Sequence, residues 1–476
     1  MYEIRKSLIK WIKSIDEAFV LENILNHMNK IIWGPATLCI FLGTGIFFLV
    51  VFNFMPWRRL GYALSLVFRP EKPAGKVKGD ITPFASLMTS LGACMGTGNI
   101  AGVACALVLG GPGALFWMCL SSFTGLPVIF AECVLSVRYR EKSKTGMMCG
   151  GPMYVMKYGI GKKTGMVLAV CFSVFTVGAS FGIGNMTQTN AAAAAMKEIW
   201  HIPKPLTGFF MAVSVFLVLV AGIGGIGRIC SIIVPAASML YLSCAFTVII
   251  LNYRNIPGSF LEIIHMAFSA KAVTCGIGGS ITASMYTAMK WGIARGVFSN
   301  EAGLGSAPIA AAAAKTDAPA KQGYIHMIGA FIDTAVMCTV TGLAICASGV
   351  LGMKDMNGQL ITGVELTIRA FETALKGGGH IICAGMLFFA FPTLLGWAYY
   401  GEKALIFLTG QRFEKYAVVI YRILFCVMCY VGAVKALKPV WDFSDIMNGL
   451  MAVPNLICLW IKWREVREIC LKEQKK

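Results

Sequence analysis

Charge is scarce in this chain. Only 14% of its 476 residues are charged, whereas 57% are hydrophobic. The mean hydropathy of +0.71 is too high for a soluble protein, whose surface must face water. Acidic residues are the scarcer sign, 23 against 42 basic ones, which gives a formal net charge of +19. The composition therefore excludes a soluble globular protein and predicts an all-α integral membrane protein that sits in a lipid bilayer.

Several functional motifs are also missing. No G-x-x-x-x-G-K-[ST] loop occurs, so nothing predicts transport driven by ATP bound through such a loop. The five histidines are scattered and form no triad or metal-ligating set, so we expect no catalytic residues and no cofactor. A channel would need a continuous polar stripe or a repeated charged ring, and the sequence has neither. An ion channel and a polytopic membrane enzyme are thus the remoter alternatives to a transporter.

The basic residues gather in three clusters, in short connections and in the tail. They are Arg58, Arg59, Arg69, Lys72, Lys76 and Lys78; Arg138, Arg140, Lys142, Lys144, Lys157, Lys162 and Lys163; and Lys462, Arg464, Arg467, Lys472, Lys475 and Lys476. No stacking aromatics accompany them, so we expect no nucleic-acid partner. The positive-inside rule instead places all three clusters in the cytoplasm. Because one span precedes the first cluster, the N-terminus is expected outside and the C-terminus inside.

Eleven apolar runs are about long enough to cross a bilayer. They cover residues 31–54, 82–109, 113–137, 166–196, 207–223, 229–251, 280–314, 323–352, 380–408, 414–436 and 441–463. Residues 1–26 are basic and amphipathic, without a cleavage site after them. The stretch 357–376 has charged residues at helical spacing, which predicts an amphipathic helix on the outer face.

Glycine-rich interruptions break two of these runs, at 96–99 and at 300–305. Lipid offers no partner to a bare amide or carbonyl, so a spanning helix can unwind only where its backbone meets protein, water or a ligand. Paired breaks of this kind point to a transporter's binding site.

The broken helices are the first and the sixth of the ten spans that follow the first one. This order predicts two five-helix repeats of inverted topology that share one site near the bilayer midplane. We assign residues 1–80 to the N-terminal segment, extra helix and basic loop. The two repeats are 81–255 and 256–465, and the cytoplasmic tail is 466–476.

The first break combines two helix-weakening glycines with two polar side chains, Gly96, Thr97, Gly98 and Asn99. Amides that start the second half of such a helix can point at an anion, so these residues are candidates for a substrate carboxylate. Close helix packing through small residues is the alternative.

Around the second break, the backbone carbonyls of Phe298, Ser299 and Asn300 are candidates for an ammonium group or a cation. Ionisable residues inside a span are costly and mark function by default, which draws attention to Arg295 and Glu301. Their roles are expected to be gating or structural. The alternative places Glu301 at the cytoplasmic interface, paired with Arg295 or a loop lysine.

Two further spans have polar residues at mid-length. Gln188 shares a helical face with Asn185, and it contacts either substrate or a neighbouring helix. In 380–408, Pro392 is expected to interrupt the helix, with Thr393 and Trp397 on one face. A hydroxyl beside a freed carbonyl suits Na⁺, although an ordinary proline kink is equally consistent.

Six motifs together resemble one known family. They are Gly-Thr-Gly-Asn-Ile-Ala-Gly-Val-Ala (96–104), Leu-Gly-Gly-Pro-Gly-Ala (109–114), Gly-Gly-Pro-Met-Tyr (150–154), Ser-Phe-Gly-Ile-Gly-Asn-Met (180–186), Phe-Ser-Asn-Glu-Ala-Gly-Leu-Gly-Ser-Ala-Pro (298–308) and Gly-Trp-Ala-Tyr-Tyr-Gly-Glu (396–402). The chain is similar to the alanine or glycine:cation symporters, also called sodium:alanine symporters, from about residue 30 to 460.

The resemblance implies a LeuT-like fold and Na⁺-driven, in some members H⁺-driven, uptake of small neutral amino acids across the plasma membrane, here a prokaryotic inner membrane. It implies that the 96–99 break binds the substrate carboxylate. Gln188, the backbone of 298–300, Thr393 and Trp397 would complete the pocket. Na⁺ would bind the backbone carbonyls of Cys94 and Met95, with help from Thr393.

The chain departs from the family pattern at four positions. Threonine is usual at Cys94, glutamine near Ala85, lysine near Ile129 and histidine near Ala312. Cys94 adjoins the proposed site, so glutamine or serine is an alternative substrate to alanine and glycine. A thiol is also a poor sodium ligand, which leaves the coordination to backbone carbonyls.

Overall fold

The computed structural model describes residues 23–25, 27–69, 77–270, 272–276, 279–410, 413–435 and 438–474, almost all of them helical. The predicted amphipathic stretch at residues 1–26 lies largely outside the described residues. The basic residues Lys72, Lys76, Lys475 and Lys476 also lie outside them. Within the described part, eight helices are long and apolar enough to span a membrane. Each of the eleven predicted segments overlaps a helix or a broken helix of the structure.

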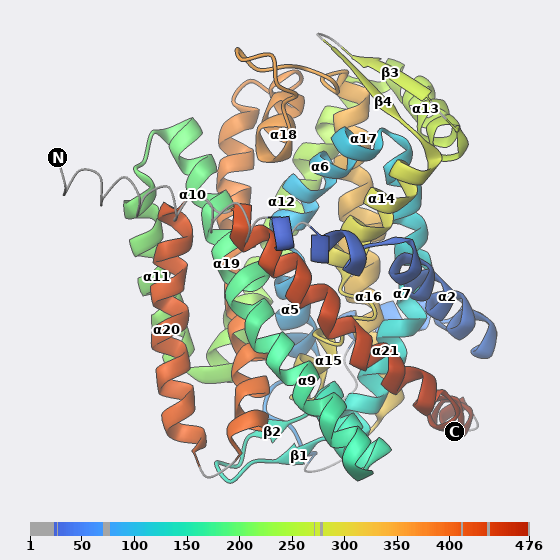
Figure 1. Ribbon diagram of the computed structural model, residues 1–476, viewed down its shortest axis with the longest axis vertical. Helices are drawn as coiled ribbons and strands as arrows, with labels where there is room; N and C mark the ends of the chain where they lie inside the picture. The colour runs from blue at the N-terminus through green and yellow to red at the C-terminus, as the bar shows by residue number, and fades with distance from the viewer. Residues whose placement is uncertain are drawn as a thin grey trace, which may run out of the picture.

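Figure 1 labels most of the helices, and the short 3-10 and π stretches among them are named η1 to η5. In chain order they are α2 (Pro35–Val51), α3 (Met55–Arg58), α4 (Leu60–Phe68), α5 (Pro83–Cys94), η1 (Thr97–Asn99), α6 (Ala101–Gly110), α7 (Gly113–Arg138), α8 (Pro152–Tyr154), η2 (Val155–Ile160), α9 (Lys162–Phe181), η3 (Gly182–Met186), α10 (Thr187–Trp200), α11 (Lys204–Val220), α12 (Gly222–Leu251), η4 (Tyr253–Asn255), α13 (Ile256–Phe268), α14 (Met285–Asn300), α15 (Ala307–Ala311), α16 (Pro319–Ala330), η5 (Phe331–Cys338), α17 (Thr339–Ser348), α18 (Gly363–Glu372), α19 (Gly378–Thr409), α20 (Glu414–Val434) and α21 (Lys438–Gln474). Two antiparallel hairpins pair β1 (Glu141–Lys142) with β2 (Met148–Cys149) and β3 (Ala272–Gly276) with β4 (Gly279–Ala283).

The first break is present where the glycines predict it. The Thr82 hydroxyl accepts from the amide of Ala85 and Pro83 stands in the first turn, so α5 begins with an N-cap of the usual kind. Helix α5 ends at Cys94, the turn η1 follows, and α6 begins at Ala101.

The second break divides the predicted helix 280–314, and the start of that prediction is wrong. Residues Gly279–Ala283 form strand β4, and α14 begins only at Met285, after a capping box made by Ser284 and Thr287. Helix α14 ends where Glu301 adopts the left-handed conformation, with φ of 59°. The chain then turns into the short helix α15.

Other predicted helix boundaries and interruptions also differ from the structure. Proline 392 does not interrupt its helix, because α19 continues through it from Gly378 to Thr409. A proline costs a long spanning helix one backbone hydrogen bond, which neighbouring groups can offset. The 441–463 segment is part of a longer helix, α21, and α13 and the β3–β4 hairpin were not expected. A helix, α18, lies within the predicted stretch 357–376, and its place on the outer face stays a prediction.

Small residues let the central helices approach closely. A Cβ atom added at Gly292 of α14 would lie 2.3 Å from the carbonyl oxygen of Ala114 in α7, and one at Gly45 of α2 would lie 2.5 Å from that of Thr124. Helix α7 thus packs against α14 and α2 and, through Gly323, against α16. The hairpin β1–β2 marks one end of the bundle, here called the basic end, and β3–β4 and α18 mark the opposite end (Figure 1). The assignment of inverted repeats to 81–255 and 256–465 stays a prediction.

Candidate functional site

The two breaks face each other inside the bundle. A Cβ atom added at Gly98 would lie 3.5 Å from the Phe298 ring and 3.8 Å from the Ser299 hydroxyl. One added at Gly96 would lie 2.6 Å from Gln188 Oε1 and 2.8 Å from Thr393 Oγ1. Six of the residues that the sequence singled out therefore lie together around the first break, contributed by the break itself, α10, α14 and α19.

Gln188 caps the first break. Its Oε1 accepts a hydrogen bond from the Thr97 amide at 3.0 Å, and its Nε2 donates to the carbonyl of Ile183 at 3.0 Å. Ile183 lies in the π segment η3, where the helix is widened; such bulges are frequent at functional sites. Gln188 is thus held at both ends of its amide, and it fixes the backbone of the break.

Thr393 and Trp397 present one face of α19 to the same region, as their spacing predicts. The Thr393 hydroxyl has two acceptors, the carbonyls of Gly92 in α5 at 2.8 Å and Phe389 at 2.9 Å. Trp397 is buried against Gly184, at which an added Cβ would lie 2.2 Å from the Trp397 Cβ. Only glycine leaves room for this indole.

The Asn99 side chain makes a contact that the sequence did not predict. Its Nδ2 donates to the carboxylate of Asp333 at 2.8 Å and to the Asp333 backbone carbonyl at 3.0 Å. The amide that was expected to receive a substrate carboxylate therefore already holds a carboxylate of the protein.

Asp333 is fully buried in η5, at the meeting point of the two breaks. The hydroxyls of Ser299 and Thr334 both donate to its Oδ2 at 2.7 Å. Its described neighbours supply neutral donors only, with no lysine, arginine or histidine among them. A buried carboxylate without a cationic partner is costly in a membrane. Asp333 is the one acidic residue in the predicted run 323–352, so that rule would have found it.

The alternative that places Glu301 at the cytoplasmic interface, paired with Arg295 or a loop lysine, is not what the structure shows. Glu301 is buried, and its carboxylate accepts a short hydrogen bond from the Ser306 hydroxyl across the second break. The Cys94 thiol and the Trp397 indole also lie within hydrogen-bonding reach of it. Arg295 instead forms an ion pair with Asp445 of α21, with 3.5 Å between Nη2 and Oδ2.

A second buried carboxylate supports the second break from outside. Glu132 of α7 accepts from Asn455 Nδ2 at 2.5 Å, and the same amide donates to the Gly303 carbonyl at 2.9 Å. Sequence reasoning missed both side chains. Glu132 and Asn455 are far in the chain from the loop that they support, so local patterns do not reveal them. The one signal in the sequence is a single glutamate, Glu132, in an apolar run.

Two buried oxygen atoms at the first break have no hydrogen-bond partner among the described residues. They are Thr97 Oγ1 and Asn99 Oδ1. Buried polar side-chain atoms are nearly always paired, so these two are available to a ligand. The Asn300 side chain faces α7, where its Oδ1 accepts from the Ala302 amide at 2.9 Å, while its Nδ2 has no partner among the described residues.

The four departures from the family pattern lie in different places. Cys94 adjoins the site, and its carbonyl accepts from the Gly96 amide at 2.8 Å, while Met95 follows it at the end of α5. Ala85 packs against Gly227, and the Ala312 side chain faces Gly150 near the basic end. Ile129 is buried in α7. Only Cys94 touches the residues that form the candidate site.

One arginine, Arg140, links two segments of the chain at the basic end. Arg140 donates to the carbonyls of Ala312 at 2.9 Å, Ala314 at 2.6 Å and Lys78 at 2.9 Å, and also to that of Thr316. Burial lowers the pKa of Arg140 from its ordinary value, but a guanidinium stays charged in proteins. The segments before α5 and after α15 are thereby tied together.

Comparisons with known proteins agree with this architecture. A sequence model described as the sodium:alanine symporter family matches residues 18–473. The sodium/alanine symporter AgcS of Methanococcus maripaludis is 43% identical over 438 residues, which cover 92% of this chain and 94% of that protein. The probable sodium/glutamine symporter GlnT of Bacillus subtilis is 33% identical over 444 residues, 93% of this chain and 88% of that protein.

Among solved structures, the crystal structure of MhsT in complex with L-phenylalanine is similar, with a TM-score of 0.56 over 81% of this chain and 90% of that one. The two sequences are 14% identical, so the likeness is one of fold. That fold is the LeuT-like arrangement of membrane helices.

Proposed function

Since the chain belongs to the sodium:alanine symporter family, we propose that it couples the entry of Na⁺ to the uptake of a small neutral amino acid, alanine or glycine first. The chain is a membrane transporter, not an enzyme. We further propose that it lies in the plasma membrane with the basic end in the cytoplasm, the N-terminus outside and the C-terminus inside. Glutamine or serine is the alternative substrate, favoured by the named function of GlnT and by the thiol of Cys94 beside the site.

The unpartnered Thr97 hydroxyl carries this proposal. It is buried at a helix break, and it can donate to a substrate carboxylate beside the backbone amides of the break. The ammonium group then lies toward the carbonyls of Phe298 to Asn300, where α14 ends. Trp397 closes the pocket on the side of α19 and limits the length of the substrate side chain.

Two positions suit Na⁺. One lies between the carbonyls of Cys94 and Met95 and the Thr393 hydroxyl, which adjoins Gly96. The other lies at Asp333, where Asn99 Oδ1 is unpartnered and the carboxylate lacks a cation. Broken helices of transporters coordinate cations in this manner. A proton on Asp333 is the alternative to the second ion.

Transport follows from differential binding. Na⁺ at these positions orders the first break and thereby the amino-acid site, so the loaded state is favoured over the half-loaded one. One group of helices then rocks against the other around the fixed site. The coupling needs no ATP and no resident cofactor, since the sodium gradient supplies the free energy.

The test is uptake of labelled alanine, glycine, serine and glutamine by the full chain in proteoliposomes. We expect alanine or glycine to accumulate with an inward sodium gradient and not with an equal potassium gradient. Accumulation of serine or glutamine alone would support the alternative substrate. If none of the four accumulates under a sodium or a proton gradient, the proposed function is wrong.

A further inference from the structure

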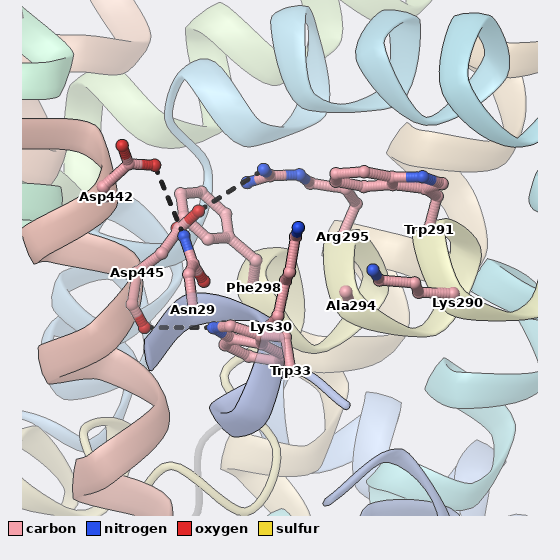
Figure 2. Close-up of a pocket in the computed structure, with 10 residues that line it drawn as sticks. All are labelled: Asn29, Lys30, Trp33, Lys290, Trp291, Ala294, Arg295, Phe298, Asp442 and Asp445. Carbon is pink, nitrogen blue, oxygen red and sulfur yellow. Dashed lines mark hydrogen bonds and ion pairs between the residues drawn. The ribbon is translucent and has the colours of Figure 1, made fainter. Parts of the chain in front are cut away.

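A cavity adjoins the candidate site on the side away from the basic end. Its volume is about 260 Å³, just below the usual size of small-molecule pockets, roughly 300–1,000 Å³. Phe298 lines it, and a Cβ atom added at Gly98 in the first break would lie 3.5 Å from the same ring. Figure 2 places the other walls on α14, on the first turns of α21 and on the helix that leads into α2.

The walls carry charges of both signs. Arg295 and Lys290 come from α14 and Lys30 from the N-terminal helix, while Asp442 and Asp445 come from α21 (Figure 2). Three cationic groups thus face two carboxylates around one small cavity. The ion pair between Arg295 and Asp445 is long, at 3.5 Å, and only one oxygen of Asp445 takes part in it.

Polar atoms of both kinds are left without a hydrogen bond among the described residues. Asp442 Oδ2 and Asp445 Oδ1 are buried acceptors, and Arg295 Nε is a buried donor. Asn448 lies one turn further along α21, and neither atom of its amide is paired. Because buried polar atoms are nearly always satisfied, a ligand with a donor at one end and an acceptor at the other would suit this group.

Aromatic rings complete the cavity. Trp291 and Phe298 both lie under the Arg295 guanidinium, whose central carbon is 5.8 Å and 5.2 Å from the two ring centroids. Trp33 donates from its indole to the Asp445 backbone carbonyl at 3.0 Å, which fixes that wall. Arg295 thus has cation–π contacts with both rings in addition to its ion pair.

We propose that this cavity is a second binding site, which takes a zwitterionic amino acid by both of its charges before the molecule reaches the central pocket. The ligand carboxylate binds Arg295 and the lysines, and the ligand ammonium binds Asp442 and Asp445. Binding redirects Arg295 from the Phe298 ring, so that the ring can turn and admit the ligand to the first break. This inference rests on the proposed function for the class of ligand.

The experiment measures the accessibility of one cavity position. Ala294 lines the cavity on α14 and is replaced in Ala294→Cys, and the purified full chain is labelled with a maleimide in lipid nanodiscs containing Na⁺. Among the described cysteines only Cys39 is exposed, and the unmodified chain supplies the background rate. We expect millimolar alanine to slow the labelling of Ala294→Cys at least fivefold. Propionate and ethylamine, which each keep one charge, should not.

Three second substitutions separate the new site from the central one. With Gln188→Ala, which disables the central pocket, protection by alanine should persist. With Asp442→Asn it should be lost, because the ammonium partner is gone. With the matched change Asp355→Asn, in an exposed loop at the same end of the bundle, it should be unchanged.

A measurement without substitutions covers the case that a variant does not fold. Equilibrium binding of labelled alanine to the unmodified chain should saturate at two molecules per chain. Saturation at one, loss of protection with Gln188→Ala, or protection that survives Asp442→Asn would overturn the second site. Normal uptake of alanine beside any of these results leaves the proposed function intact, whereas absence of both uptake and binding refutes that function itself.

Discussion

Gly96→Ala tests whether the first break is built around a missing side chain. The backbone angle φ of Gly96 is −114°, outside the left-handed region that favours glycine, so the expected effect is worked from the contacts of the added methyl group. The added methyl carbon would lie 2.6 Å from Gln188 Oε1 and 2.8 Å from Thr393 Oγ1. Gln188 cannot move away freely, because its other amide atom is bonded to the Ile183 carbonyl.

The cost follows from the hydrogen bond that must break. Displacing Gln188 leaves the buried Thr97 amide without its acceptor, which costs about 1–3 kcal/mol. If the substrate-bound state depends on that backbone geometry, the affinity for alanine falls roughly 5- to 150-fold. We expect the apparent KM for alanine uptake to rise by that factor, with a smaller change in the thermal stability of the empty protein.

Gly102→Ala is the matched control, since a Cβ atom there meets nothing within 4 Å. It should leave uptake unchanged, and by reducing the backbone entropy of the unfolded chain it should stabilise α6 by about 0.5–1 kcal/mol. Both variants are assayed for sodium-dependent alanine uptake in proteoliposomes and for unfolding temperature. Uptake by Gly96→Ala with the KM of the unmodified chain would refute the account of the first break.

The remaining predictions concern packing, the cation and the membrane potential. Gly184→Ala should destabilise the fold by about 1–3 kcal/mol, because the added methyl group overlaps Trp397. The control Gly224→Ala should not, since a Cβ atom there meets nothing within 4 Å, and thermal unfolding of both variants measures the difference. Asp333→Asn should raise the Na⁺ concentration for half-maximal alanine uptake at least tenfold, since the substitution removes the charge but keeps one hydrogen-bonding oxygen. An unchanged sodium dependence would exclude Asp333 as a cation site. If one Na⁺ enters with one zwitterion, each 100 mV of inside-negative potential contributes about 2.3 kcal/mol, or roughly 50-fold in accumulation. Uptake measured at imposed potassium diffusion potentials tests this dependence. Uptake that does not depend on the potential would mean electroneutral transport.

The breaks could be predicted because they are local. Glycine weakens a helix wherever it stands, so the run Gly96 to Asn99 signals an interruption without any knowledge of its neighbours. The same local reasoning failed at Pro392, where a long helix simply continues. It also missed the β3–β4 hairpin, although the facing pairs Val273 with Thr282 and Thr274 with Ile281 are β-branched, a composition typical of strands.

The partners across the site could not be predicted in this way. Whether Asn99 meets a substrate or Asp333 depends on how two helices are rotated and shifted against each other, and the spacing within one helix does not contain that information. The same holds for Arg295, which pairs with Asp445 instead of Glu301. Buried charge was an informative signal at two positions, since Asp333 accepts from Ser299 beside the second break, and Glu132 accepts from Asn455, whose amide also donates to the Gly303 carbonyl.

Arg140 has a mechanical consequence for the two broken helices. Its guanidinium holds the strand-like stretch before α5 to the stretch after α15, where the Asp80 amide also bonds to the Ala313 carbonyl at 2.8 Å and the Lys315 amide to the Ile81 carbonyl at 2.8 Å. Separating the two stretches would break the hydrogen bonds of the Arg140 guanidinium to the backbone carbonyls, and each such charge-assisted bond contributes about 1.5–3 kcal/mol. Because the two broken helices are joined at this end, we expect them to tilt together, so that the two sides of the pocket move at the same time.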